Sequence, residues 1–293
     1  MNNLDYFDQA GLRWDRLQQD HVELAVRLSE EAGWNQVAAD WRLMIDAGDA
    51  VGVCTSDARL VASALTLPFG GPFAWISMVL VTADYRHRGI ATRLLQDCLE
   101  RVAKIGKIAG LDATPAGREV YRPLGFRDVY GLSRRWARTP PHVTPVGRSG
   151  IAVRRIRPDD LGNLADYDRV GFGADRQLIL QHLTERVPER AFLALRGDDI
   201  AGFALARDGR DAHHLGPVMA DDWEVTETLV GHALANIERP VYVDVPDHQS
   251  EFAQWLSNLG FETQRPYTRM LFGRSEAYGE PACVFAIAGP ELG

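Results

Sequence analysis

The sequence predicts an α/β (α+β) protein in which one fold occurs twice, each time as a mixed, mostly antiparallel twisted sheet flanked by helices. At 293 residues the chain has room for two domains of ordinary size. A stretch rich in proline and glycine, residues 139–150, divides it into nearly equal halves. Both halves show a strand, a helical segment, a second strand and a short helix that ends in Leu-Gly-Phe, at 124–126 and 259–261. We therefore expect domains at 1–138 and 151–293 joined by a linker.

In the first half, two helices are expected before any strand. Apolar residues from Leu12 to Ala32 recur with an imperfect helical period, and a second helix, from Gln36 to Ala47, follows the Gly33-Trp34-Asn35 turn. Three strands separated by turn residues come next, which predicts an antiparallel meander. These strands are expected at residues 50–55, 59–68 and 73–82.

The chain then changes its hydrophobic period. Residues 90–105 place apolar side chains on one side of a helix, and Cys98 among them is expected to be a small core residue. A strand at 108–113 leads into a helix that starts near Pro115 and ends before Gly125. Strand, helix and strand in this order make a parallel pair, so the expected sheet is mixed.

The second half repeats this frame. It contains four further apolar strands, with a helix between the third and the fourth and another before Gly260-Phe261. The strands are expected at residues 191–196, 200–207, 214–219 and 241–245, and the first of these helices at 225–237.

The composition is that of a globular protein without general affinity for polyanions. Hydrophobic residues make up 46% and charged residues 25% of the chain. The net charge of −8 opposes binding to nucleic acid or to anionic membranes. Cys54, Cys98 and Cys283 form no CxxC pair, so they suggest neither a disulfide framework nor a zinc site. The N-terminus is acidic and has no apolar stretch of the kind that a signal peptide contains, and the longest apolar segment, around Trp75 to Val81, is far too short to span a membrane. We therefore expect a cytoplasmic protein that binds no metal.

One short segment carries recognisable chemistry. The strand that ends near Thr82 is followed by Arg86-His87-Arg88-Gly89, and the next helix opens directly after it. The first N–H groups of a helix have no partner within the helix and carry partial positive charge, and a glycine lets the backbone approach a ligand closely. Such a loop is suited to hold a pyrophosphate. A glycine at a tight turn is the plainer alternative.

Residues 81–91 resemble the acetyl-CoA-binding motif of the GCN5-related N-acetyltransferase (GNAT) superfamily, whose signature is Arg/Gln-x-x-Gly-x-Gly/Ala. The run from Arg86 to Ala91 matches every fixed position. Downstream, Tyr121-Arg122-Pro123-Leu124-Gly125-Phe126 resembles the last conserved block of that superfamily, in which a tyrosine stands four residues before Gly-Phe. The resemblance covers about residues 12–136.

The resemblance implies that acetyl-CoA is the co-substrate and indicates which residues hold it. Backbone groups of Val79, Leu80 and Val81 would bind the pantetheine arm like an added strand, and one of their N–H groups would stabilise the oxyanion. The acceptor amine would attack the thioester directly in a ternary complex, while Tyr121 protonates the departing thiolate. The loop and helix residues implied in cofactor binding are Arg86, His87, Arg88, Gly89, Ile90, Ala91 and Thr92.

Two positions depart from the superfamily pattern. Ala83 stands where a proline is usual, which is a cosmetic change. Thr114 stands where an asparagine often opens the last helix, and this weakens one expected cofactor contact.

The resemblance implies an acyltransferase and leaves the acceptor open. We expect a primary amine on a small molecule, because a second domain of equal size could close one side of the cleft, and the net charge would favour a cationic amine. The general base is open among Glu30, Glu31, Asp40 and Asp112, with a water chain as the alternative. A non-catalytic acetyl-CoA-binding regulatory module and a tandem acetyltransferase similar to mycothiol synthase are the alternative functions. The sequence favours no oligomeric state.

The second half keeps the frame and is expected to have lost the cofactor site. Asp221, Asp222 and Glu224 stand in the loop that corresponds to the turn with arginine and glycine, and their carboxylates would repel a pyrophosphate. Leu256 occupies the place of Tyr121. We therefore expect no acetyl-CoA binding in this half.

The second half also resembles a C-terminal domain attached to such acetyltransferases, through motifs at 171–176, 215–218 and 244–246. Asp175, Arg176 and Arg269 are polar residues at structured places, where a ligand role is possible and capping or ion pairing is favoured. His213 and His214 are neighbours on an expected strand, so they point to opposite faces and do not share a metal ion.

Overall fold

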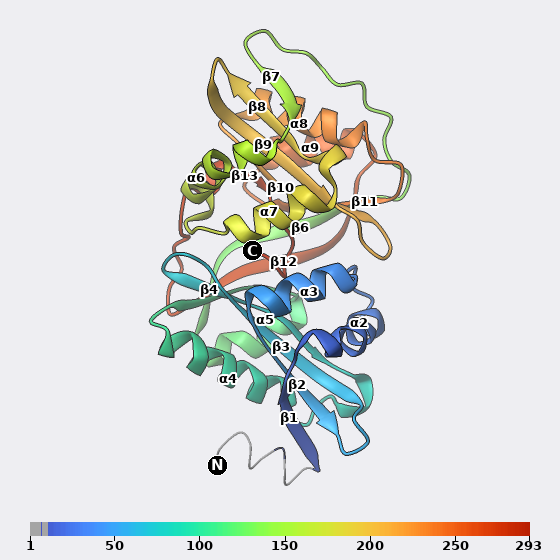
Figure 1. Ribbon diagram of the computed structural model, residues 1–293, viewed down its shortest axis with the longest axis vertical. Coiled ribbons are helices and arrows are strands. Elements are labelled where there is room, and N and C mark those ends of the chain that lie inside the picture. The colour runs from blue at the N-terminus through green and yellow to red at the C-terminus, as the bar shows by residue number, and fades with distance from the viewer. Residues whose placement is uncertain (1–6, 8–10) are drawn as a thin grey trace. The chain divides into compact units, whose positions relative to one another are not determined.

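The computed structural model describes Phe7 and residues 11–293, and the chain divides into two compact units (Figure 1). Unit 1 comprises residues 1–111 and unit 2 residues 112–293. This boundary lies well before the linker expected at 139–150. The reason is a strand from the first half of the chain that pairs within unit 2.

Unit 1 is built on a five-stranded mixed sheet. β1 (Leu12–Arg16), β2 (Asp49–Thr55), β3 (Leu60–Pro68) and β4 (Phe73–Val81) pair antiparallel in chain order. β5 (Ile108–Ala113) pairs parallel with β4, because the helix between them returns the chain to the same end of the sheet. The meander and the mixed sheet expected from the sequence are therefore confirmed.

Three helices cover this sheet. β3 and β4 are buried along nearly their whole length, which requires cover on both faces. The cover comes from α2 (Val22–Glu31), α3 (Ala38–Ala47) and α4 (Ile90–Lys104), all of which pack on β3. Cys98 of α4 is buried as expected, and burial raises the pKa of its thiol to about 12.

The helix expected from Leu12 to Ala32 is wrong over its first third. Residues 12–16 form β1, a 3-10 helix follows at Gln19–His21, and the α-helix begins at Val22. β1 pairs residue by residue with β2, from Leu12 opposite Thr55 to Arg16 opposite Val51. Pairing with a neighbouring strand outweighs a weak helical period, which is the usual way in which tertiary context overrides local preference.

Unit 2 repeats the frame. β7 (Ala152–Arg155), β8 (Phe192–Arg196), β9 (Asp199–Arg207) and β10 (His213–Ala220) pair antiparallel in order, and β11 (Val241–Pro246) pairs parallel with β10. The sequence predicted four of these strands and the helix between the last two. The helices are α6 (Leu161–Phe172), α7 (Gln177–Arg186), α8 (Trp223–Leu234) and α9 (Ser250–Asn258).

A strand from the first half completes the sheet of unit 2. β6 (Phe126–Ala137), to which the sequence analysis assigned no strand, lies between β11 and β12 (Glu262–Phe272) and is antiparallel to both. Leu132, for example, stands opposite Pro246 on one side and Tyr267 on the other. The short helix α5 (Pro115–Tyr121) belongs to the same unit.

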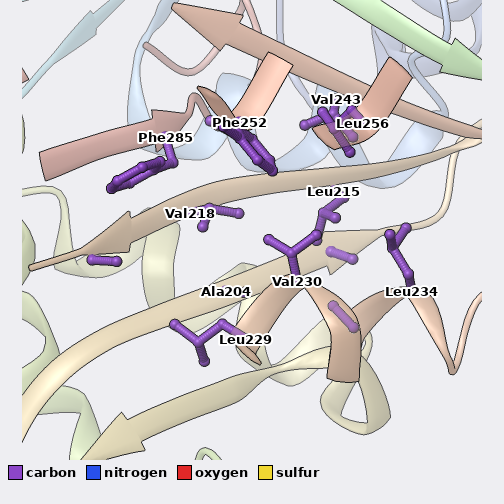
Figure 2. Packing of buried hydrophobic residues seen from close by; sticks show 14 of the residues in the cluster. Ala204, Leu215, Val218, Leu229, Val230, Leu234, Val243, Phe252, Leu256 and Phe285 are labelled. Atoms are coloured by element: carbon purple, nitrogen blue, oxygen red, sulfur yellow. The ribbon is translucent and has the colours of Figure 1, made fainter. Parts of the chain in front are cut away.

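The core of unit 2 gathers around β10 and α8. Leu215 and Val218 of β10, Leu229 of α8 and Phe252 of α9 are fully buried and belong to one apolar cluster (Figure 2). Phe285, from the short strand β13 (Val284–Ala286), belongs to the same cluster and lies beside Phe252. The core therefore includes a segment close to the end of the chain.

Candidate functional site

β4 presents an open backbone edge just before the signature loop. β5 pairs with β4 only along residues 73–75. Beyond Trp75, no strand among the described residues of unit 1 pairs with residues 76–81 on that edge, while β3 occupies the other edge. Two parallel strands that separate in this way leave backbone N–H and C=O groups to which an extended ligand can add.

A bulge in β4 marks the place where this edge opens. Met78 and Val79 together stand opposite the single residue Ala64, and Met78 has a positive φ of 51°. The buried Ser63 hydroxyl donates to the carbonyl oxygen of Met78 (2.8 Å), which holds the bulge in place. Val79, Leu80 and Val81, predicted to bind the pantetheine arm, follow directly.

The signature loop folds on its own backbone. The Arg86 Nε donates to the Val81 carbonyl (3.0 Å), and the Arg88 Nη2 donates to the Asp84 carbonyl (2.8 Å). The Arg88 guanidinium also lies over the ring of Tyr85, 4.8 Å from its centre. Both arginines stay exposed, so their charge remains at the surface of the loop.

The loop ends at the N-terminus of α4, which no side chain caps. His87 (φ 60°) and Gly89 (φ 75°) are left-handed, and Gly89 is the N-cap residue of α4. No side chain caps α4, and its first turn contains no acidic residue. The N–H groups of Ile90, Ala91 and Thr92 therefore remain for an anion, which is the geometry of a phosphate site at a helix N-terminus.

Glu31 ties helix α2 to the start of this loop. Its carboxylate accepts from the Thr82 hydroxyl (2.6 and 2.7 Å) and from the Ala83 N–H (2.8 Å). The Thr82 hydroxyl and then the Ala83 N–H lower the pKa of Glu31, because both bond to its charged form. Sequence reasoning offered Glu31 as a general base, whereas the structure places it as an ionised anchor of the loop.

Two other carboxylates that were candidates for the general base are also engaged. Asp40 is buried and accepts from the Val37 N–H (2.8 Å), at the start of α3. Asp112, in unit 2, forms a two-bond ion pair with Arg269 (2.8 and 2.9 Å), and burial raises its pKa although Arg269 opposes the shift. Glu30 is exposed.

Tyr121 is the last residue of α5, in unit 2. Thr114 is the N-cap residue of α5, since its hydroxyl accepts from the Gly117 N–H (3.1 Å). The half-buried Tyr121 ring lies over Gly117, where a Cβ would stand 3.0 Å from it, and 6.0 Å from the ring of the buried Phe126. The ring of the predicted general acid therefore packs against Gly117 and Phe126.

The corresponding loop of unit 2 is closed to an anion. The Asp222 carboxylate caps α8 by accepting from the Val225 N–H (3.1 Å), and it pairs with Arg196 (2.7 Å). Glu224 adds a second carboxylate in the first turn. The helix end that α4 leaves open is thus occupied in α8 by the chain's own carboxylate.

The polar residues singled out in the second half are structural. Asp175 accepts from the Gln177 N–H (2.8 Å) at the start of α7, and Arg176 forms a buried two-bond pair with Asp168. His213 lies 3.1 Å from Arg190, while His214 lies 3.2 Å from Asp244, so the two histidines have separate surroundings.

Beyond these contacts, the described residues hold no group of three or more histidine, cysteine or acidic side chains that could bind a metal ion. In the same part of the chain, no helix has the length and apolar character needed to cross a membrane.

Comparison with known families and proteins assigns both halves to one family. Residues 14–126 match the pattern described as "Acetyltransferase (GNAT) family", and residues 164–286 match "Acetyltransferase (GNAT) domain". The chain is 28% identical over 236 residues to holothin acyltransferase from Pseudoalteromonas sp., covering 80% of this chain and 78% of that protein. It is 23% identical over 281 residues to the uncharacterized N-acetyltransferase YitH from Bacillus subtilis, covering 95% and 97%.

Solved structures show the same fold. A putative acetyltransferase from Pyrococcus horikoshii superposes with a TM-score of 0.80 at 20% identity and covers 97% of this chain and 96% of its own. A tandem GNAT protein from the clavulanic acid biosynthesis pathway superposes with a TM-score of 0.64 at 15% identity, covering 89% and 98%. The tandem architecture expected from the sequence is confirmed.

Proposed function

Because this chain belongs to the GNAT superfamily of acetyltransferases, with two GNAT domains in tandem, we propose that it moves an acetyl group from acetyl-CoA to a primary amine of a small molecule in a ternary complex. That it is an acyltransferase follows from its family, and GNAT domains use acetyl-CoA as co-substrate. The amine, the size of the acceptor and the order of the chemistry are the proposal. Residues 1–138 act in it as the catalytic domain and 151–293 as the degenerate one.

The observation that supports the cofactor site is the uncapped N-terminus of α4. Its free N–H groups follow a loop with two exposed arginines and a histidine, and no carboxylate stands in its first turn. We assign the pyrophosphate to residues 86–92 and the pantetheine arm to the open edge at 79–81. An N–H of that edge, next to the bulge at Met78, serves as the oxyanion donor.

Tyr121 is assigned the role of general acid. The departing thiolate is the conjugate base of a thiol with a pKa near 8.5. A tyrosine hydroxyl at hydrogen-bond distance can protonate this thiolate. The assignment rests on the spacing of the Tyr121 to Phe126 block and on the packing of the ring described above. Because Glu31, Asp40 and Asp112 are engaged in structural hydrogen bonds, we assign the removal of the amine proton to Glu30 or to a water chain.

The acceptor class is supported by one relative. Holothin acyltransferase is named for holothin and not for a protein substrate, and it aligns with 80% of this chain. We therefore expect a small amine, and holothin itself is one candidate to include in a screen.

The proposal is tested by titrating acetyl-CoA into the whole protein by calorimetry and then measuring release of free coenzyme A with a thiol reagent. The acceptor panel contains holothin, polyamines, aminoglycosides and an N-terminal peptide amine. Release that depends on a small amine supports the proposal. Release of coenzyme A with the peptide alone would show that the acceptor is a protein amine and not a small molecule. Tight binding of acetyl-CoA without release of coenzyme A in the presence of any amine would favour the non-catalytic alternative.

A further inference from the structure

The groove of unit 2 that corresponds to the cofactor groove of unit 1 already has an occupant. In unit 1 the parallel strands separate after Trp75, and in unit 2 they separate after Leu215, at the same stage of the frame. Each separation is followed by a register shift against the next strand of the meander. The shift falls at Met78 and Val79 in unit 1 and at Gly216 and Pro217 in unit 2. Aligned on this shift, Val218 and Met219 correspond to Leu80 and Val81.

β13 pairs with this edge of β10. Val218 stands opposite Ala286 and Met219 opposite Val284, on the side of β10 that faces β11. The next residue, Ile287, donates its N–H to the Asp244 carbonyl of β11 (3.0 Å). Residues 284–287 thus make backbone pairs with both separated strands, as an extended ligand between them would.

Side chains fix the segment deep in the unit. Val284, Phe285, Ala286 and Ile287 are at most 7% exposed, and the Phe285 ring stands edge-on to Phe252 of α9, 6.1 Å away (Figure 2). Such burial of four consecutive side chains favours a stable contact over a transient one.

Polar contacts hold the segment on both sides of β13. Before it, the Gln249 amide donates to the carbonyls of Ala282 and Val284 (2.8 and 3.1 Å). After it, the buried Glu291 forms an ion pair with Arg207, which in turn lies 3.1 Å from His214. Hydrogen bonds and charge therefore add to the apolar packing at each end.

We propose that residues 284–287 are the built-in occupant of the second GNAT groove, a peptide strand in the place that the pantetheine arm takes in the first. The second groove is thus a peptide-binding groove filled by the chain itself, and each chain binds one acetyl-CoA. The count of one rests on the proposed function of the first groove, whereas the peptide pairing does not.

Amide hydrogen exchange on the full chain, with and without saturating coenzyme A, tests the pairing. Residues 218–220 and 284–287 should exchange slowly in the free protein and should not change when coenzyme A is added, while residues 79–92 become protected. Faster exchange of 284–287 on addition of coenzyme A would overturn the proposal, because the ligand would then displace the segment. Fast exchange of 218–220 and 284–287 in the free protein would overturn it as well.

A variant separates this proposal from general stability. Phe285→Ala should speed exchange of residues 218–220 and 284–287 at least about tenfold and leave the affinity of the first groove unchanged. Leu234→Ala is the matched control, since it truncates a buried residue of the same core on α8, and it should not speed exchange of residues 284–287 more than that of the rest of the unit. Equal exchange in Phe285→Ala and wild type would contradict the proposal.

Calorimetry with acetyl-CoA supplies the count of sites. One site per chain supports the proposal and two sites refute it. If no acetyl-CoA binds at all, the proposed function fails, and the exchange of residues 218–220 and 284–287 still decides whether the second groove is filled by the chain.

Discussion

The two grooves of this protein show how one frame can be kept open or closed by very few residues. Both begin with three parallel residue pairs and then separate beside a register shift. In the first, Gly89 starts an uncapped helix and the strand edge is free within unit 1. In the second, Asp222 caps the helix and β13 occupies the edge.

The comparison shows that a ligand site needs unsatisfied groups and not only a shape. Backbone N–H groups at a helix end and at a strand edge are costly to bury without partners, so they must be met by a ligand, by water or by the chain itself. In unit 2 the chain itself meets these groups, both at the end of α8 and at the edge of β10. The groove that the order of elements predicts is occupied by the chain itself, at the helix end by Asp222 and at the strand edge by β13.

The largest expected effect comes from removing the second half. A chain that ends at residue 138 leaves β6 without β11 and without β12, which pair with it on its two sides. We expect this fragment to show no cooperative thermal unfolding and to aggregate, because a twelve-residue strand with two open edges is exposed. Circular dichroism and sedimentation measure both properties.

The control keeps every strand. A protease site inserted between residues 142 and 148, where the chain forms no helix or strand, cuts the same connection after folding. The cut protein should remain one particle with unchanged melting. A stable, monomeric 1–138 fragment would show that β6 does not depend on the second half.

Gly89→Glu should abolish cofactor binding in the first groove. The substitution strains a left-handed residue and puts a carboxylate at the end of α4, as in the second groove. We expect acetyl-CoA affinity to fall at least about 100-fold by calorimetry, from the combined loss of the anion site and its charge. Gly106→Glu has the same kind of backbone (φ 70°) beyond the other end of α4 and should leave affinity unchanged.

Tyr121→Phe should lower kcat by about 100-fold while the dissociation constant of acetyl-CoA stays the same, because a general acid contributes to the rate and not to cofactor binding. The ring remains packed on Gly117, so folding should be unaffected. Steady-state kinetics with the acceptor found in the screen gives the comparison, with Tyr278→Phe as control. An unchanged kcat would remove Tyr121 from the mechanism.

Glu31→Gln should weaken acetyl-CoA binding by about threefold to tenfold, since a neutral amide replaces a charge-assisted acceptor at the start of the loop. Because the pKa of Glu31 is lowered in the fold, its contribution is complete at neutral pH. The contribution is lost as the pH falls through that lowered value, below 4.5. The affinity ratio of wild type to variant should therefore be constant near neutral pH and fall toward one as the pH is lowered below 4.5. Glu30→Gln is the neighbouring control, and a ratio that does not depend on pH would contradict the assignment.

Asp222→Ala should have the smallest effect. Loss of the cap of α8 should lower the free energy of unfolding by about 1 kcal/mol, measured by denaturant titration, with Asp198→Ala as an exposed control. It should not create a second acetyl-CoA site, because β13 still fills the groove. A second site in this variant would mean that the carboxylate alone had closed it.

The sequence predicted the local parts of this fold well and the long-range parts poorly. The meander at 50–82 and the signature loop depend on neighbours in the chain, where glycine, alternation and helix period are directly informative. The strand at Leu12 was missed because its partner lies about forty residues away, in β2. The sequence places the domain boundary at 139–150 because proline and glycine mark a flexible connection. These residues carry no information on where the strand before them, β6, finds its partners.

The cofactor site stays a prediction, and its parts differ in how far the sequence reaches them. Gly89 and the arginines are assigned by a motif whose chemistry is local. Glu31 could not be assigned its role, because its bond to Ala83 joins residues 52 positions apart and exposed acidic residues on a helix are usually solvated. The occupant of the second groove could not be predicted from the sequence, since residues 284–287 are a short apolar run like many others.

The place of β6 also has a consequence during synthesis. Its last residue is Ala137, and its partner strand β12 ends at Phe272. At about 5 to 20 residues per second, a ribosome needs roughly 7 to 27 s to make the chain between them. Until β12 is complete, β6 keeps at least one unpaired edge on the nascent chain, so factors that shield emerging strands should raise the yield of this protein more than that of one whose strands pair in chain order.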